Sequence, residues 1–304
     1  MSNCEKNVDK VINYNDTRKY KFTDEVKIID DIHGKYHTLH RIEALIDIPR
    51  HNVKAGDLGG FIEYNYNLSH HDYAWVADNA IVFGQNAIVK NDAIVRDNAI
   101  VTDNAVISGE ADVNDRAMIY GNAQIFERAY IGNCAKVYDD AKVFGDAEVS
   151  YSANVHGRAE VSGSSKIVND TDVSGNVYIK GKVLVDNRAI VRGNGNICKN
   201  AIITDDTILD GFYCIGKDAY ITNSNDVMTF TSITPHGKSI TFYTCSARRI
   251  RVCIENLHLF IPDLKKFCRR YYGNSKYSKL IIQAYRMARR KFNIGIKLFE
   301  RHYY

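Results

Sequence analysis

The segment that decides the fold reads AIVRDNAIVTDNAVISGEADVNDRAMI at residues 93–119, and it repeats a pattern of six residues. A small residue opens each hexad, as at Ala93 and Ala99, and an aliphatic residue follows two positions later. A hexapeptide period is typical of a β-helix, in which three hexads complete one triangular coil of about 18 residues. The register extends over residues 74–222, so we expect a mainly β chain with a parallel β-helix of about eight triangular coils.

Within each coil the aliphatic residue should point into the prism, and the small residue should lie near a corner where bulk would clash. Asp, Asn and Gly are frequent just before the alanine, as at Asp97-Asn98, where short polar side chains tolerate a left-handed backbone. One step, from Ala80 to Ala87, is seven residues long and predicts a corner insertion near Gly84 or Gln85.

Outward positions are apolar at both ends of the predicted column, for example Ile81 at the start and Ile208 near the end. A solvated column has no need of such exteriors. We therefore expect the end modules or neighbouring subunits to cover them.

The residues that lead into the repeat resemble a known family. The segments LHRIEAL, VKAGDLGGFIE, NLSH and AWVADNA, which begin at residues 39, 53, 67 and 74, closely resemble the start of the YdcK-like bacterial and phage proteins. These are hexapeptide-repeat proteins of the left-handed β-helix type, often labelled as transferases. The resemblance covers roughly residues 20–222 and implies a left-handed coil.

The resemblance also implies an N-terminal β cap over residues 19–73, and a solenoid end needs such a cover for its unpaired backbone groups. Gly56, Gly59 and Gly60 are expected to allow tight turns in this cap. Residues 1–18 are expected to be a flexible N-terminus.

The repeat ends near Asp226, and residues 226–304 predict a basic α+β module. Three strands are expected within residues 228–254, followed by a helix that Pro262 opens and a second helix that Ser275 caps. Residues 248–304 hold 15 Lys and Arg against three acids, although the whole chain carries only +4. Such an end suits an anionic partner, or the acidic column of another subunit.

The seven cysteines are odd in number, scattered and without a CxxC pair, which predicts a reduced, cytoplasmic protein with no metal site. No apolar run is long enough to span a membrane, so no membrane partner is expected.

Positions 18 residues apart stack on such a column, so Tyr120, Tyr138 and His156 should form a ladder of rings. The ladder either stabilises the coils or stacks on a planar ligand such as a base. Basic and aromatic residues of the C-terminal module can pair with phosphates and stack on bases: Arg269, Arg270, Tyr272, Arg286, Arg289 and Arg290. A merely solvated basic face is the alternative for that group.

Three functions follow from these features. The favoured one is a non-catalytic homotrimer that binds an anionic, nucleotide-like small molecule without a cofactor. Nucleic acid is a second candidate partner. A phage-type sequestering, anti-defence role rests on resemblance alone. The second is an acyltransferase that uses acetyl-CoA, with His156 as the catalytic base, as the resemblance implies. Coils 87–221 carry no inserted loop that could build a substrate pocket, which favours binding over catalysis. The third is a structural scaffold without a small ligand.

Overall fold

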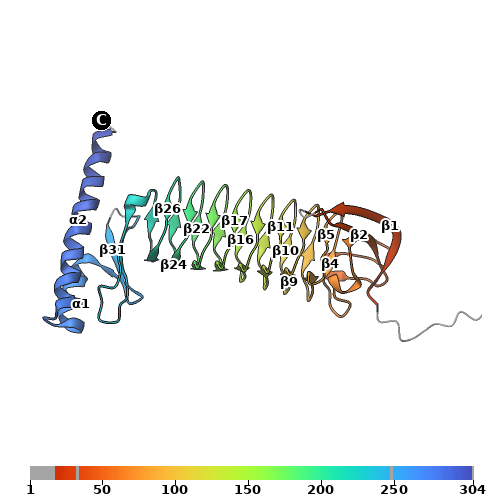
Figure 1. The fold of residues 1–304 in the computed structure, drawn as a ribbon, viewed down its shortest axis with the longest axis horizontal. Coiled ribbons are helices and arrows are strands. Elements are labelled where there is room, and N and C mark those ends of the chain that lie inside the picture. The colour runs from red at the N-terminus through yellow and green to blue at the C-terminus, as the bar shows by residue number, and fades with distance from the viewer. Residues whose placement is uncertain (1–17, 32–33, 247–248, 303–304) are drawn as a thin grey trace, which may run out of the picture.

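The computed structural model describes residues 18–31, 34–246 and 249–302, the last ten of them by backbone only. The chain forms a long column with a β cap at one end and a small sheet with two helices at the other (Figure 1). Apart from residue 18, the predicted flexible N-terminus lies outside the described residues.

Three parallel sheets form the faces of the column. The first face holds β3 (Leu58–Ile62), β5 (Ile81–Val82), β8 (Ile100–Val101), β11 (Met118–Ile119), β14 (Lys136–Val137), β17 (Asn154–Val155), β20 (Asp172–Val173), β23 (Ile190–Val191) and β26 (Ile208–Leu209). The second holds β4 (Trp75–Val76), β7 (Ile94–Val95), β10 (Asp112–Val113), β13 (Tyr130–Ile131), β16 (Glu148–Val149), β19 (Lys166–Ile167), β22 (Leu184–Val185), β25 (Ile202–Ile203) and β28 (Tyr220–Ile221). The third holds β6 (Ile88–Val89), β9 (Val106–Ile107), β12 (Gln124–Ile125), β15 (Lys142–Val143), β18 (Glu160–Gly163), β21 (Tyr178–Gly181), β24 (Asn194–Lys199) and β27 (Phe212–Ile215).

Each strand pairs in parallel with the strand one coil later, as Ile94 pairs with Asp112 and Asp112 with Tyr130, so the coil has the predicted length. The aliphatic position is buried throughout, and Val143, Val149 and Val155 are fully inaccessible. Burial of such a side chain contributes about 1.5–3 kcal/mol before chain entropy is subtracted. The hexad prediction is thus confirmed.

The corners also follow the sequence. Asp97, Asp103 and Asp115 have φ values of 60°, 61° and 56°, in the left-handed region. The predicted insertion lies at Gly84, whose φ is 97° and whose N–H donates to Oε2 of Glu63 at 2.8 Å.

The N-terminal cap consists of β1 (Tyr20–Asp30) and β2 (Tyr36–Ala44), which pair antiparallel, with short 3₁₀ turns at Pro49–His51 and Asn65–Asn67. Strand β3 pairs antiparallel with β2 and parallel with β5, so the cap adds one rung to the column. The column therefore has about nine turns rather than the expected eight. Ile81 is covered by Leu39 and Phe61 of the cap, as predicted.

Two of the three cap glycines serve close packing and not turns. Gly56 has a φ of 96° and does lie in a turn, but Gly59 and Gly60 are inside β3. A Cβ on Gly59 would lie 2.6 Å from Cζ2 of Trp75, and a Cβ on Gly60 would lie 2.5 Å from the carbonyl oxygen of Ala80. These contacts leave no room for a side chain, so the prediction of tight turns is wrong at both positions.

The C-terminal module holds a four-stranded antiparallel sheet of β29 (Val227–Phe230), β30 (Ile240–Thr244), β31 (Ile250–Ile254) and β32 (Leu257–Phe260), after a 3₁₀ turn at Ser224–Asp226. Strand β32 was not expected from the sequence. Helices α1 (Ile261–Tyr272) and α2 (Lys276–His302) follow, and the Ser275 hydroxyl accepts the N–H of Ser278 at 3.4 Å, as a cap should.

Successive side chains of these strands point to opposite faces of the sheet, and the sheet lies between the helices and the end of the column. Ile240, Phe242 and Val252 pack with helix residues, whereas Tyr243 and Cys253 belong to the core of the column. Among the described residues, no helix combines the length and the apolar character needed to cross a membrane.

Candidate functional site

A cleft of about 710 Å³ lies where the third face of the column meets the C-terminal sheet. One wall comes from the outward side of β21, β24 and β27, and the other from β30, β31 and the loop before β30. This volume is within the range of small-molecule sites, which are often found between modules.

Two outward ladders with the 18-residue spacing form the column wall. Asn176 donates from Nδ2 to Oδ1 of Asn194 at 2.9 Å, and Asn194 pairs in register with Phe212. In the second ladder Tyr178 pairs with Asn196, which pairs with Cys214. The wall therefore offers amide donors and acceptors between aromatic rings.

The rings of these ladders are open to solvent. Tyr178 is 51% exposed and Phe212 is 55% exposed. They lie two coils apart, about 10 Å along the column at a strand spacing of about 4.8 Å, with β24 between them. Their faces are available for stacking.

The opposite wall supplies charge. His236 and Lys238 come from the loop before β30, and Glu255 comes from the turn between β31 and β32. The carboxylate of Glu255 accepts the hydroxyl of Tyr272 at 2.8 Å, and burial is the main reason that the pKa of this tyrosine is raised. Cationic, anionic and amide groups thus converge on one cleft.

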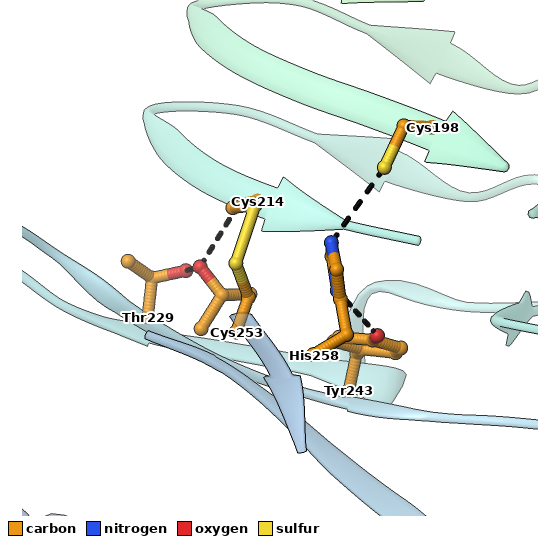
Figure 2. Close-up of a disulfide and its surroundings, with 7 residues drawn as sticks. Cys198, Cys214, Thr229, Tyr243, Cys253 and His258 are labelled. Carbon is orange, nitrogen blue, oxygen red and sulfur yellow. Dashed lines mark hydrogen bonds between the residues drawn. A yellow bond between two sulfur atoms is a disulfide. The ribbon is translucent and has the colours of Figure 1, made fainter. Parts of the chain in front are cut away.

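Next to the cleft, sulfur and imidazole groups gather from both modules (Figure 2). Cys214 of β27 and Cys253 of β31 form a disulfide, which corrects the prediction of wholly reduced cysteines. His258 of β32 pairs in register with Cys253, and its Nε2 lies 3.6 Å from Sγ of Cys198 on β24. The hydroxyl of Tyr243 lies 2.9 Å from Nδ1 of the same imidazole.

The protonation of this cluster follows from burial. Burial, together with the smaller effects of the like charges of Lys199 and Arg251, lowers the pKa of His258 to about 4, so the imidazole is neutral at pH 7. Burial also raises the pKa of the Cys198 thiol, against the opposing effect of Lys199. Both groups are therefore uncharged near neutral pH.

The predicted ladder forms, but away from this cleft. The rings of Tyr120 and Tyr138 stack at 4.8 Å between centroids, and those of Tyr138 and His156 stack at 4.6 Å. Nε2 of His156 lies 3.2 Å from Oδ2 of Asp172, and Nδ1 lies 3.7 Å from Oδ2 of Asp139. The three rings follow strands of the first face in the middle of the column, and none of them lines the cleft.

The predicted basic residues also lie apart from the cleft. Arg269 and Arg270 on α1 are exposed, as are three arginines of α2, namely Arg286, Arg289 and Arg290. Both helices pack on the face of the sheet opposite the column (Figure 1). Of this predicted group, Tyr272 contacts a cleft residue, because its hydroxyl donates to the carboxylate of Glu255.

The cleft residues could have been found in part from the sequence. Asn176, Asn194 and Phe212 stand 18 residues apart, as do Tyr178, Asn196 and Cys214, so both ladders obey the spacing that identified the tyrosines. The partner wall depends on how the C-terminal sheet docks, which no local pattern encodes.

Comparison with models of known protein families gives no match to this chain, and comparison with curated protein sequences gives none either. The chemistry of the cleft is therefore the basis for assigning a function.

Proposed function

We propose that the protein binds a nucleotide-like anion in the cleft between the column and the C-terminal sheet. The observation that carries this proposal is the combination of exposed rings, asparagine amides and a lysine around one cavity. A base has a π-face for Tyr178 or Phe212 and a polar edge for Asn194 and Asn196. No single residue type would suggest this ligand class.

The charged wall suits the remainder of such a ligand. The ammonium of Lys238 pairs with a phosphate through a charge-assisted hydrogen bond. The carboxylate of Glu255 accepts ribose hydroxyls, as acidic residues do in dinucleotide-binding folds. The helix arginines lie behind the sheet and add a long-range positive potential rather than direct contacts.

Binding without turnover is the form of this function that we favour, as in a protein that sequesters its ligand. The supporting resemblance to the left-handed β-helix, YdcK-like family concerns the column and its cap. We propose further that three copies associate through column faces, because the column leaves an apolar side chain such as Ile208 exposed on its first face. Light scattering of the purified chain measures this state.

An acyltransferase is the second candidate, and the pairing of His156 with Asp172 is the observation that favours it. A carboxylate that orients a histidine is the arrangement of a general base. The ring of His156 is stacked on Tyr138, and neither His156 nor Asp172 lines the described cleft. A substrate would therefore have to bind on a column face or between subunits.

The test is calorimetric titration of the full chain with linear nucleotides, cyclic nucleotides and acetyl-CoA. We expect a nucleotide to bind, and Phe212→Ala and Lys238→Ala each to weaken binding by roughly 10-fold or more. Tyr138→Ala is the matched control, because it removes a stacked ring outside the cleft and should leave affinity unchanged.

Other outcomes assign the other functions. A response to acetyl-CoA that disappears in His156→Ala would establish the transferase alternative and overturn our proposal. If neither nucleotides nor acetyl-CoA bind, the result would favour a structural scaffold. Nucleotide binding lost in Tyr138→Ala but retained in Phe212→Ala would place the site on the ladder instead of the cleft.

A further inference from the structure

Four potential metal ligands converge beside the cleft, and they come in two pairs from the two modules. Cys198 and Cys214 point outward from adjacent coils of the third face, while Cys253 and His258 are a cross-strand pair of the C-terminal sheet. The ligand atoms of Cys214, Cys253 and His258 all lie within 4.8 Å of one another, and Sγ of Cys198 is 3.6 Å from Nε2 of His258. Figure 2 shows Cys198 directed at His258, with the Cys214–Cys253 disulfide beside the imidazole.

This donor set and its spacing suit zinc. Structural zinc sites use four cysteine and histidine ligands in a tetrahedron, with Zn–S near 2.3 Å and Zn–N near 2.0 Å. Those bond lengths place a sulfur and a nitrogen ligand about 3.5 Å apart. The 3.6 Å between Cys198 and His258 is close to that tetrahedral edge.

The imidazole is already held as a metal ligand would be. Its Nδ1 is fixed by the hydroxyl of Tyr243, a fully buried residue, which leaves Nε2 directed toward the sulfur atoms. Metal-bound histidines commonly make such a second contact through the other ring nitrogen.

The backbone nearby leaves the necessary space. Gly216 lies against the cluster, and a Cβ at this position would be 2.7 Å from Sγ of Cys198 and 2.9 Å from Cε1 of His258. Any larger residue would push these two ligands aside. The glycine thus allows the side chains of Cys198 and His258 to lie next to each other.

We propose that Cys198, Cys214, Cys253 and His258 form a zinc site when the Cys214–Cys253 disulfide is reduced. A dithiol reductant breaks the S–S bond, supplies two electrons and two protons to the two sulfurs, and is itself oxidised to a disulfide. Zinc binding then displaces one proton from each of the three thiols, because cysteine coordinates as the thiolate. The oxidised form keeps the covalent link and loses two of the four ligands.

Either state joins the C-terminal sheet to the column. The disulfide does so through one bond, and the zinc ion does so through two ligands from each module. The redox state would therefore change the shape of the wall that Cys214 and Cys253 contribute to the cleft without releasing the module. This inference does not depend on which ligand the cleft holds.

The experiment uses the full chain with any affinity tag removed. Protein is reduced with a dithiol, freed of metal by a chelator, passed over gel filtration under argon, and titrated with Zn²⁺ or with Co²⁺ as a spectroscopic probe. We expect one zinc ion per chain, and with cobalt the intense visible bands of a tetrahedral thiolate complex. The oxidised protein should bind zinc at least about 100-fold more weakly, because half of the ligand set is absent.

Variants identify the ligands. Cys198→Ser and His258→Ala should each lower zinc affinity by roughly 10- to 100-fold or more and change the cobalt spectrum. Cys134→Ser is the control, since Cys134 is an exposed thiol in the middle of the column and should not affect binding. Circular dichroism checks that each variant is folded, and the comparison of oxidised with reduced wild type needs no variant at all.

The proposal fails if the reduced wild-type chain takes up no zinc. It fails equally if Cys198→Ser and His258→Ala retain wild-type affinity with an unchanged cobalt spectrum, or if oxidised and reduced protein bind zinc alike.

Discussion

Gly195→Ala is the change by which the packing of the cleft can be tested most directly. Gly195 and Tyr213 both occupy the small position of their hexads, one coil apart. A Cβ on Gly195 would lie 1.9 Å from Cε2 and 2.1 Å from Cζ of Tyr213, far inside van der Waals contact. The tyrosine ring rests on the glycine, and its hydroxyl donates to the carbonyl of Arg192 at 3.1 Å.

The added methyl group forces this ring to move by more than 1 Å. Overpacking of a well-packed core costs about 1–3 kcal/mol. Displacement of the ring also breaks the hydrogen bond of a hydroxyl on a residue that is only 5% exposed, which adds about 0.5–1.5 kcal/mol. We therefore expect Gly195→Ala to lower the free energy of unfolding by about 1.5–4.5 kcal/mol, although alanine is the consensus residue of the repeat.

A double-mutant cycle in urea, followed by circular dichroism, separates this effect from others. Tyr213→Ala removes the ring, and in that background Gly195→Ala should cost little or even stabilise, because the new methyl group then fills vacated space. The coupling between the two sites should be about 2 kcal/mol or more. If Gly195→Ala costs the same with and without the Tyr213 ring, the ring does not rest on this glycine and our description of the cleft wall is wrong.

Two further predictions concern the N-terminal cap and the middle of the column. Burial lowers the pKa of Lys19 from 10.5 to about 8, so between these pH values the unfolded chain binds more protons than the folded chain. The stability of the wild type relative to Lys19→Met should therefore rise by about 2 kcal/mol between pH 8 and pH 10. A stability difference that stays constant over this window, measured by urea denaturation, would refute the assignment. Tyr138→Ala removes the central ring between Tyr120 and His156 and should lower the free energy of unfolding by about 1–3 kcal/mol through lost stacking and burial. An unchanged unfolding midpoint in urea would show that the ladder does not stabilise the column.

The column was predictable because its rule is local and repeated. Every coil repeats a buried aliphatic residue, and many coils repeat a left-handed Asp or Asn before the small residue. The pattern would therefore be recognisable even if a few hexads were placed in the wrong register. The extra rung was missed because β3 precedes the register and joins the column through a strand that also pairs antiparallel with β2. Glycines 59 and 60 were misjudged because glycine in a sequence signals turns and close packing equally.

The cleft escaped prediction for a different reason. The repeat restricts the residue type at inward positions and leaves outward positions free to vary. In the sequence, the ladders of Asn194 and Asn196 therefore look the same as a solvated ladder such as Asn104 with Asn122. What distinguishes them is the sheet that docks opposite. That docking depends on contacts distant in sequence, such as the Thr241 hydroxyl that accepts the N–H of Cys214 at 3.0 Å.

Within that sheet, a two-residue turn decides which side chains meet the column. Glu255 and Asn256 have φ values of 48° and 67°, the left-handed pair of a type I′ turn, and this turn fixes Cys253 opposite His258. Side chains alternate along a strand, so a slip of one residue would turn both groups toward the helices and bring Val252 and Leu259 to the column instead. The apolar contacts of Val252 and Leu259 with the helices oppose such a slip. The same alternation that builds the helix-facing core therefore places sulfur and imidazole against Cys198 and Cys214, and the metal site and the cleft wall depend on one register.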